Sequence, residues 1–328
     1  MKPLWIDTPT QLAEACAQWQ TRDWISVDTE FVRINTYRAQ LCLVQIGDGS
    51  LNACIDPLAI DDLTPMWALM ANAGILKVLH ASGQDFELVV EHTGRTPAPV
   101  FDTQIAATLI GLGDQLGYAG LVEKRLGLPV DKSLSRTDWA RRPLTQPEID
   151  YAADDVRHLS ALYPALRDEV AARGRLPWLL EDCERLTEPT RYQVLPENAW
   201  TRLKGLNRLP ADAQGRAAAL AAWRETEAAQ RNRPRKWILE DAALYRMAER
   251  NPQTPDALAT LAVLPDKTLS RHGKALLEVL EQANGLPVHV WAEPEFAGET
   301  KARFKALQAA VREVAESLDL PPGFLAPR

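Results

Sequence analysis

WISVDTEF, residues 24–31, reads as a strand and carries two acids, Asp28 and Glu30, with one residue between them. Side chains on a strand alternate between its two faces, so these carboxylates point the same way and Thr29 points the opposite way. Two like charges roughly 6–7 Å apart are tolerable in water but unfavourable on a dry face. Taken alone, the pattern fits either a solvated face or a functional site.

Elements around this stretch define the fold class. Strands are predicted over residues 24–31, 39–48, 51–57 and 75–81, and GDGS (47–50) predicts a hairpin. Helices are predicted over residues 7–20, 83–92, 101–112, 117–128 and 145–174, and three of them begin with cap signals at Thr8, Ser82 and Thr145. Hairpin strands followed by alternating strands and helices predict a mixed-sheet α/β domain.

Composition excludes several classes. At 46% hydrophobic and 25% charged residues the chain is an ordinary globular protein, and a net charge of −7 gives no support to a binder that is basic all over. Its cysteines, Cys16, Cys42, Cys54 and Cys183, form no C-x-x-C pair, so we expect free thiols and no structural zinc. The sequence shows neither a signal-peptide core nor an 18-residue apolar run, so we expect a cytoplasmic protein without a membrane span.

The second half of the chain changes character. Strand patterns stop, and from about residue 193 the sequence is helical and rich in alanine and leucine, which places a domain boundary at 187–192. A second break at 284–296 is followed by a single amphipathic helix over 299–318. One such helix cannot bury its own apolar face, so we expect the chain to end inside a further module.

More acids follow the predicted strands and helices. Asp85 lies in the first turn of a helix, where it could simply complement the helix dipole. Tyr151 and Asp155 are four residues apart and share a helix face; Asp154 is near that face too, and spacing does not choose between the two aspartates. Four such acids together would need cations, and oxygen ligands favour Mg²⁺ or Mn²⁺. Two ions can clamp both oxygens of an in-line phosphoryl displacement.

Three stretches together resemble a known superfamily: DTEF (28–31), HASGQDFEL (80–88) and YAADDV (151–156) are similar to the three exonuclease motifs of the DEDD superfamily. The third motif is Y-x-x-x-D, which selects Asp155, and Asp150 stands where the histidine branch has its histidine. Wider similarity over 28–49 and 133–159 resembles the ribonuclease D family.

This resemblance implies a domain order. It implies a ribonuclease H-like 3′–5′ exonuclease domain over 1–192 and an HRDC helical domain over 193–285. Residues 286–328 would then begin a second, incomplete HRDC-like module, which is where the chain departs from the family pattern.

The resemblance also implies roles for individual residues. Asp28, Glu30, Asp85 and Asp155 would hold two divalent cations, and Tyr151 would orient the attacking water, because a tyrosine that titrates near 10 is a poor base. The implied activity is a 3′–5′ exoribonuclease that releases nucleoside 5′-monophosphates. The implied partner is RNA with a free 3′ end, such as a tRNA precursor, and the implied state is a monomer.

Candidate substrate contacts are less specific. Thr29, Phe31, His80 and Gln84 adjoin the motifs, but Phe31 fits the core equally well, and His158 receives no role. Arg141 lies in a polar connection that could line the RNA path or be solvated. Arg233 and Arg235 form a basic cluster beside Trp237, which suits nucleic acid or a helix-capping turn.

Two other functions compete with this interpretation. A DNA exonuclease would use identical catalytic residues, since selection for RNA depends on contacts to the 2′-hydroxyl that no motif reveals. A non-catalytic RNA-binding scaffold would have lost metal ligands, and the sequence keeps all of them.

Overall fold

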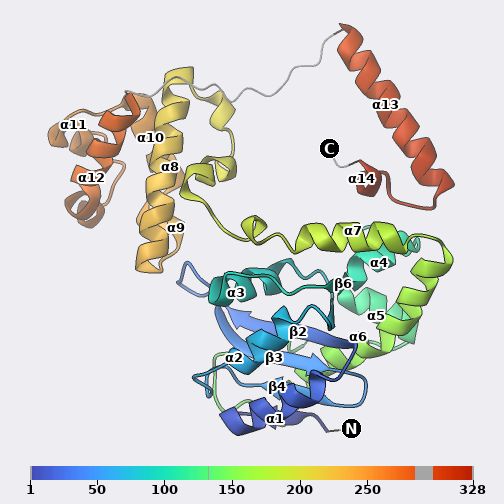
Figure 1. Ribbon diagram of the computed structural model, residues 1–328. Coiled ribbons are helices and arrows are strands. Elements are labelled where there is room, and N and C mark those ends of the chain that lie inside the picture. Colours follow the sequence, from blue (N-terminus) through green and yellow to red (C-terminus); the bar gives the residue numbers. More distant parts are fainter. Residues whose placement is uncertain (1, 132, 285–297, 327–328) are drawn as a thin grey trace. The chain divides into compact units, whose positions relative to one another are not determined.

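The computed structural model describes residues 2–131, 133–284 and 298–326, which form two compact units (Figure 1). The α/β unit comprises Met1–Val32, Gln40–Gln193 and Gly298–Arg328, and the helical unit comprises Arg33–Ala39 and Val194–Ala297.

The α/β unit is built on a six-stranded mixed sheet in the order β1-β4-β3-β2-β5-β6. The central strand β2 runs antiparallel to β3 and parallel to β5, so the predicted mixed-sheet α/β fold is confirmed. The strands are β1 (Leu4–Ile6), β2 (Trp24–Val32), β3 (Gln40–Gly47), β4 (Asn52–Ile55), β5 (Leu76–Leu79) and β6 (Val100–Asp102).

Two of these strands differ from the sequence prediction. The pattern analysis did not find β1, and it placed residues 101–112 in one helix although β6 takes Phe101 and Asp102. Both strands have three residues, too few to show an alternating pattern. Each exists because a longer parallel neighbour pairs with it, β4 for β1 and β5 for β6.

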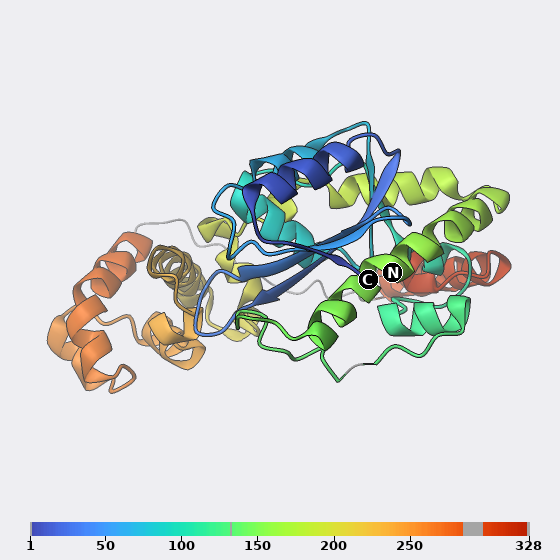
Figure 2. The same ribbon diagram turned by 90° about the horizontal axis from the view of Figure 1, so that it is seen from below.

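Helices cover both faces of the sheet, and Figure 2 shows α1 on one side and α6 on the other. Helix α6 packs on β2, β3 and β4. The helices of this unit up to residue 186 are α1 (Pro9–Trp19), α2 (Thr64–Ala71), α3 (Gly83–Thr93), α4 (Thr103–Leu109), α5 (Tyr118–Leu126), α6 (Gln146–Ala172) and α7 (Leu176–Leu186).

Helix α6 begins where its capping signal predicts. The Glu148 carboxylate accepts from the Thr145 backbone N–H at 2.7 Å and from its hydroxyl at 2.8 Å. The helix then approaches the sheet closely at Gly47, where an added Cβ would lie 2.9 Å from Ser26 Oγ and 3.3 Å from Ser160 Oγ. The missing side chain therefore lets the helix that carries Tyr151 and Asp155 lie directly on β2 and β3.

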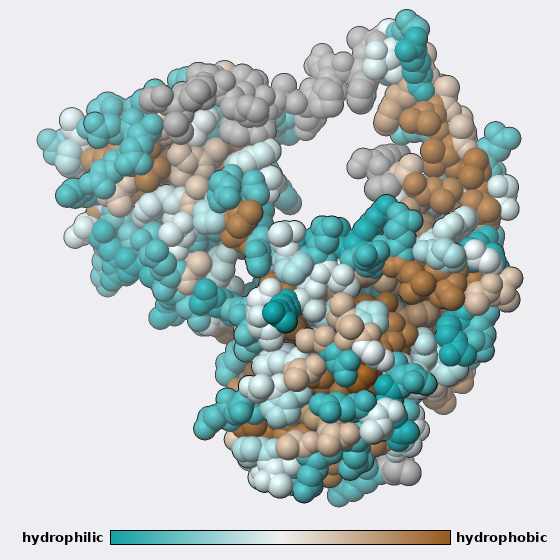
Figure 3. Space-filling model, in the orientation of Figure 1, coloured by the Kyte–Doolittle hydropathy of each residue, from teal (hydrophilic) through white to brown (hydrophobic). Residues whose placement is uncertain are grey.

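The C-terminal residues pack within the α/β unit. They form α13 (Gly298–Ser317) and α14 (Pro322–Leu325), with Ala315 and Leu320 buried. The Arg175 guanidinium donates to the carbonyls of Leu109 and Leu318, both at 2.5 Å. The rest of α13 exposes apolar side chains (Figure 3). The expected second HRDC-like module over 286–328 stays a prediction, and residues 285–297 lie outside the described residues.

The helical unit is organised around α8, which packs on α10 and α12. Its helices are α8 (Ala211–Arg231), α9 (Arg235–Ile238), α10 (Asp241–Arg250), α11 (Pro255–Thr260) and α12 (Asp266–Asn284), preceded by the 3₁₀ turns η1 (Pro189–Arg191), η2 (Pro196–Arg202) and η3 (Leu206–Arg208), the first of them still in the α/β unit. None of the helices in the described ranges of the chain is long and apolar enough to cross a membrane.

Candidate active site

Strand β2 presents its acids toward α6. The hydroxyl of Ser26, on the same face as Asp28 and Glu30, donates to the Val156 carbonyl at 2.9 Å and shares a hydrogen bond with the Ser160 hydroxyl at 2.8 Å. The strand face that carries both acids is therefore covered by a helix at its start, and the two carboxylates are partly buried. The interpretation of a simple solvated face does not describe this environment.

A third carboxylate converges on this pair. Ligand oxygens of Asp28, Glu30 and Asp155 all lie within 4.8 Å of one another. The neighbouring acid, Asp154, forms an ion pair with Arg157 instead. Helix geometry thus separates the two aspartates that spacing alone left open, and it is Asp155 that joins the strand.

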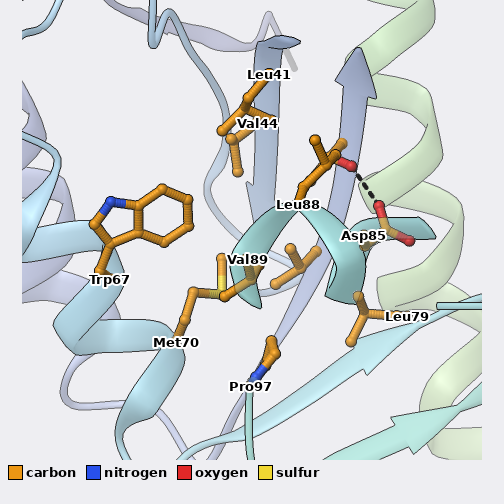
Figure 4. Close-up of a pocket in the computed structure, with 11 residues that line it drawn as sticks. Leu41, Val44, Trp67, Met70, Leu79, Asp85, Leu88, Val89 and Pro97 are labelled. Carbon is orange, nitrogen blue, oxygen red and sulfur yellow. Dashed lines mark hydrogen bonds between the residues drawn. The ribbon is translucent and has the colours of Figure 1, made fainter. Parts of the chain in front are cut away.

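Asp85 approaches the strand from the other face. Its carboxylate accepts from the hydroxyl of Thr29 at 2.5 Å, so the residue between the two strand acids holds it (Figure 4). Figure 4 shows Asp85 at the start of α3, with the apolar side chains of Leu79, Leu88 and Val89 nearby. All four acids therefore meet around three consecutive residues of β2.

Burial and neighbouring carboxylates raise the pKa values of the acids at this site. Burial, followed by the charges of Asp155 and Asp85, raises the pKa of Glu30 to about 8. Burial raises the pKa of Asp155 to about 7 and that of Asp85 to about 6, and burial with the neighbouring carboxylates raises the pKa of Asp28 well above its usual value. Carboxylates held together in this way fit divalent cations, which remove the repulsion and accept hard oxygen ligands.

Tyr151 lies one helical turn before Asp155. Its ring stacks on the buried Trp139 with centroids 6.2 Å apart and an interplanar angle of 24°. Burial and the nearby carboxylates raise the pKa of Tyr151 to about 12. A groove of about 310 Å³ is lined by Tyr151 and Asp155 together with Pro129 and Val130.

Sequence reasoning missed Tyr118, on α5. Its hydroxyl donates to the Asp155 carbonyl at 3.1 Å and forms a hydrogen bond with Nδ1 of His158 at 3.0 Å. Its ring and that of His80 pack edge to face, with centroids 5.8 Å apart. Tyr118 thereby ties the Asp155 turn of α6 to α5. No local signal could have identified it, because its partners lie 37 and 40 residues further along the chain.

The remaining predicted contacts near the motifs lie in different environments. His80 bonds through Nδ1 to the Thr103 hydroxyl at 3.0 Å, and burial lowers its pKa. Gln84 is exposed in the first turn of α3, and Phe31 is partly buried after a register shift in which Glu30 pairs with Leu43 and Phe31 with Leu41.

Two arginines of the connection before α6, Arg141 and Arg142, are paired with acids of the same unit. Arg141 donates to both oxygens of Glu148 at 2.7 Å. Arg142 binds both oxygens of the buried Asp56, at 2.6 and 2.7 Å, and the Cys42 carbonyl at 2.6 Å. Cys42 is the residue that the register shift in β3 leaves without a partner on β2, so the bulge supplies an acceptor that anchors the connection.

The two predicted arginines of the helical unit differ. Arg235 donates to both oxygens of Glu225, at 2.5 and 2.9 Å, and lies 5.0 Å from the centroid of the Tyr37 ring. Arg233 is exposed and lies over the ring of Trp237, whose side chain is 56% exposed. Only Arg233 of this pair presents its charge next to an exposed aromatic ring.

Comparison with known proteins places this geometry in a family. Residues 3–171 match the family described as 3′-5′ exonuclease, and residues 213–280 match the HRDC domain. Ribonuclease D from Zymomonas mobilis is 45% identical over 87% of this chain and 73% of its own length. Ribonuclease D from Pseudomonas paraeruginosa is 36% identical over 97% of this chain and 85% of its own.

A solved structure agrees with these relatives. The crystal structure of Escherichia coli RNase D, described as an exoribonuclease involved in structured RNA processing, covers 99% of this chain and 88% of its own, with 34% identity and a TM-score of 0.88. The chain therefore belongs to the ribonuclease D family, with a 3′–5′ exonuclease domain followed by an HRDC domain.

Proposed function

We propose that this 3′–5′ exoribonuclease hydrolyses RNA at the acid cluster around β2, with Asp28, Glu30, Asp85 and Asp155 as metal ligands and Tyr151 as the residue that orients water. The observation that carries the proposal is the convergence of three carboxylates within 4.8 Å in a partly buried site. Buried like charges are costly, and they persist where they serve a function.

The residues fit two divalent cations, Mg²⁺ or Mn²⁺, better than one. Three carboxylates gather on the α6 side of β2, while Asp85 comes from the side of Thr29, so the ligands are spread over a wider region than one ion occupies. When bound, the ions would lower the pKa of a water and stabilise charge on the phosphate. The protein supplies the ligands and orients the water through Tyr151, whose raised pKa keeps it protonated at neutral pH.

Membership in the ribonuclease D family supports the proposed substrate class. Release of nucleoside 5′-monophosphates from the 3′ end is the expected outcome, and we propose precursor tRNAs and other small structured RNAs as substrates, in the cytoplasm, for a monomeric enzyme. Among the proposed contacts are Thr29, Phe31, His80 and Gln84 near the acids. Arg141 and Arg235 would contribute only by leaving their carboxylate partners, so Arg233 is the stronger candidate for phosphate.

A time course on labelled oligonucleotides tests the function. tRNA-like RNA labelled at the 5′ end should shorten one nucleotide at a time, RNA labelled at the 3′ end should release labelled mononucleotide at once, and EDTA should stop both. Mg²⁺ and Mn²⁺ arms establish the metal. Matched DNA that is degraded as fast as RNA would favour the DNA exonuclease, and RNA that is bound but never shortened would favour the non-catalytic scaffold.

Charge reversal tests the contact in the helical unit. Arg233→Glu should weaken RNA binding and reduce its salt dependence by about one released counterion. An unchanged affinity and salt slope would remove Arg233 from the RNA path. Arg235→Glu is a poorer test, because it also breaks the ion pair with Glu225.

A further inference from the structure

The turn between β5 and α3 adopts a conformation that needs support. Ala81 has a φ of +52°, in the left-handed region that residues with a Cβ rarely occupy. Such a conformation persists only where the surrounding structure holds it in place. The turn matters because Asp85 lies four residues beyond Ala81, in the first turn of α3.

One buried carboxylate accepts hydrogen bonds from two successive residues of this turn. Asp102, 2% exposed at the end of β6, accepts from the Ala81 N–H at 3.1 Å through Oδ1 and from the Ser82 N–H at 3.0 Å through Oδ2. The Ser82 hydroxyl also donates to Oδ2 at 3.0 Å. Ser82 occupies the N-cap of α3 but does not cap it with its side chain; that hydroxyl is given to Asp102 instead.

The simplest alternative is that Asp102 only caps its own helix. It does accept from the Gln104 N–H at 2.8 Å, at the N-cap of α4. A cap needs one such bond, however, whereas three further donors come from the turn at Ala81 and Ser82. Charge-assisted bonds to buried carboxylates are the stronger ones, so most of the binding capacity of Asp102 is directed to the start of α3.

We propose that Asp102 is a positioning residue that fixes the left-handed turn at Ala81 and thereby sets the start of α3, so that Asp85 presents its carboxylate to β2. A shift of the helix start by one residue would rotate Asp85 by about 100° around the helix axis, away from Thr29 and the strand acids. This inference rests on the proposed function, in which Asp85 is a metal ligand.

The test is a titration of the full chain with Mn²⁺, following free Mn²⁺ by electron paramagnetic resonance. Asp102→Asn should weaken Mn²⁺ binding about tenfold or more, as loss of an outer carboxylate at metal sites does. Turnover of a short RNA should fall in kcat, with KM within about twofold. Asparagine has the same shape as aspartate, but its NH₂ group replaces one carboxylate oxygen and would face the N–H and O–H donors of the turn or of α4.

Asp48→Asn is the matched control. The Asp48 side chain, 2% exposed, likewise accepts from four donors, the Ser50 N–H and hydroxyl, the Leu51 N–H and Arg22, in the turn between β3 and β4. The Asp48→Asn variant should lower the thermal midpoint about as much as Asp102→Asn does, while its Mn²⁺ affinity stays unchanged. Equal Mn²⁺ affinities in the two variants would overturn the inference and leave Asp102 a structural residue.

A double-mutant cycle separates this inference from the function on which it rests. In an Asp85→Asn background, Asp102→Asn should cause no further loss of Mn²⁺ affinity, because it acts through Asp85. If Asp85→Asn itself binds Mn²⁺ normally, the ligand assignment fails; if it binds poorly while Asp102→Asn binds normally, only the positioning role fails.

A rescue variant covers the case in which Asp102→Asn folds poorly. Glycine adopts a positive φ without strain, so Ala81→Gly combined with Asp102→Asn should recover part of the lost Mn²⁺ affinity. If the folded double variant recovers no Mn²⁺ affinity, Asp102 does not act through the turn at Ala81.

Discussion

Two groups of buried or partly buried carboxylates, one in each unit of this protein, lie in opposite electrostatic environments. In the helical unit, Glu225 has a side chain only 2% exposed, yet Arg235 donates to both of its oxygens, the Tyr37 hydroxyl donates to it, and Arg202 lies 3.8 Å away. Burial alone would raise the pKa of Glu225, but these partners hold it below its usual value. In the α/β unit, Asp28, Glu30 and Asp155 face one another, and their pKa values are raised.

The difference teaches how to separate structural from functional charge. A charge that serves the fold is paired or fully hydrogen-bonded within the fold, because an uncompensated buried ion lowers the free energy of unfolding by roughly several kcal/mol. A group of like charges without internal compensation is instead completed by something that binds. Arg141 and Arg142 of the connection obey the first rule, since both pair with acids of the same unit.

The largest effect is expected from the uncompensated cluster. Asp155→Asn should lower turnover by at least about 1000-fold, because several kcal/mol of transition-state stabilisation depend on the metal site. The thermal midpoint in EDTA should stay the same or rise, since one of the repelling charges is removed. Steady-state kinetics and a thermal scan of the same preparation measure both.

Asp154→Asn is the control for that variant, because Asp154 is adjacent on α6 but ion-paired with Arg157. Its turnover should stay within about threefold of the wild type, as expected for a surface ion pair. An Asp155→Asn protein that keeps its turnover, or that unfolds in EDTA, would contradict the claim that the acid cluster serves catalysis and not the fold.

A smaller effect is expected where the charge is compensated. Glu225→Gln leaves Arg235 with a neutral acceptor and should destabilise the helical unit by about 2 kcal/mol, less than for a fully buried pair because Arg235 still reaches water. Amide hydrogen exchange along α8 measures this loss. Glu278→Gln, in the exposed pair with Lys274, should change protection by under about 0.5 kcal/mol, and equal effects of the two changes would contradict the structural role of Glu225.

The smallest effect concerns pH in the absence of metal. Glu30 has a pKa of about 8 in the folded protein against an ordinary value of 4.5, so the folded state keeps a proton that the unfolded chain releases. The stability from this group is therefore present below pH about 4.5 and is lost as the pH rises toward about 8.

Glu30→Gln should reduce the fall in the free energy of unfolding over this pH range by about 1 kcal/mol. The reduction is small because the remaining acids share the protons that Glu30 would have taken up. Urea unfolding in EDTA at several pH values measures the difference between the two proteins. If the free energy of unfolding depends on pH in the same way in wild type and variant, Glu30 is not repelled by the other acids of the cluster. The contrast with Glu225 would then fail.

Much of the site could be read from the sequence because its parts are local. The alternation along β2 put Asp28 and Glu30 on one face, and helical spacing put Tyr151 and Asp155 on another. The capping pattern at Thr145 fixed the start of the helix that carries them. The short strands β1 and β6 and the helix α2 escaped detection because their patterns are short or all apolar. Helix α7 was overlooked although its eleven residues have an apolar and a charged face.

The sequence by itself determined which residue types stand at the site and on which face of each element they lie, because side-chain direction follows from backbone periodicity. Only the tertiary structure decided which charges are used by the fold and which are left for binding. Arg141 and Arg235, predicted as RNA contacts, each pair with a carboxylate of the same unit, Glu148 and Glu225. Asp102 and Tyr118 acquire their partners only where the sheet and α6 pack together. Those pairings join residues 7 to 37 positions apart, which the periodicity of a single strand or helix does not bring together.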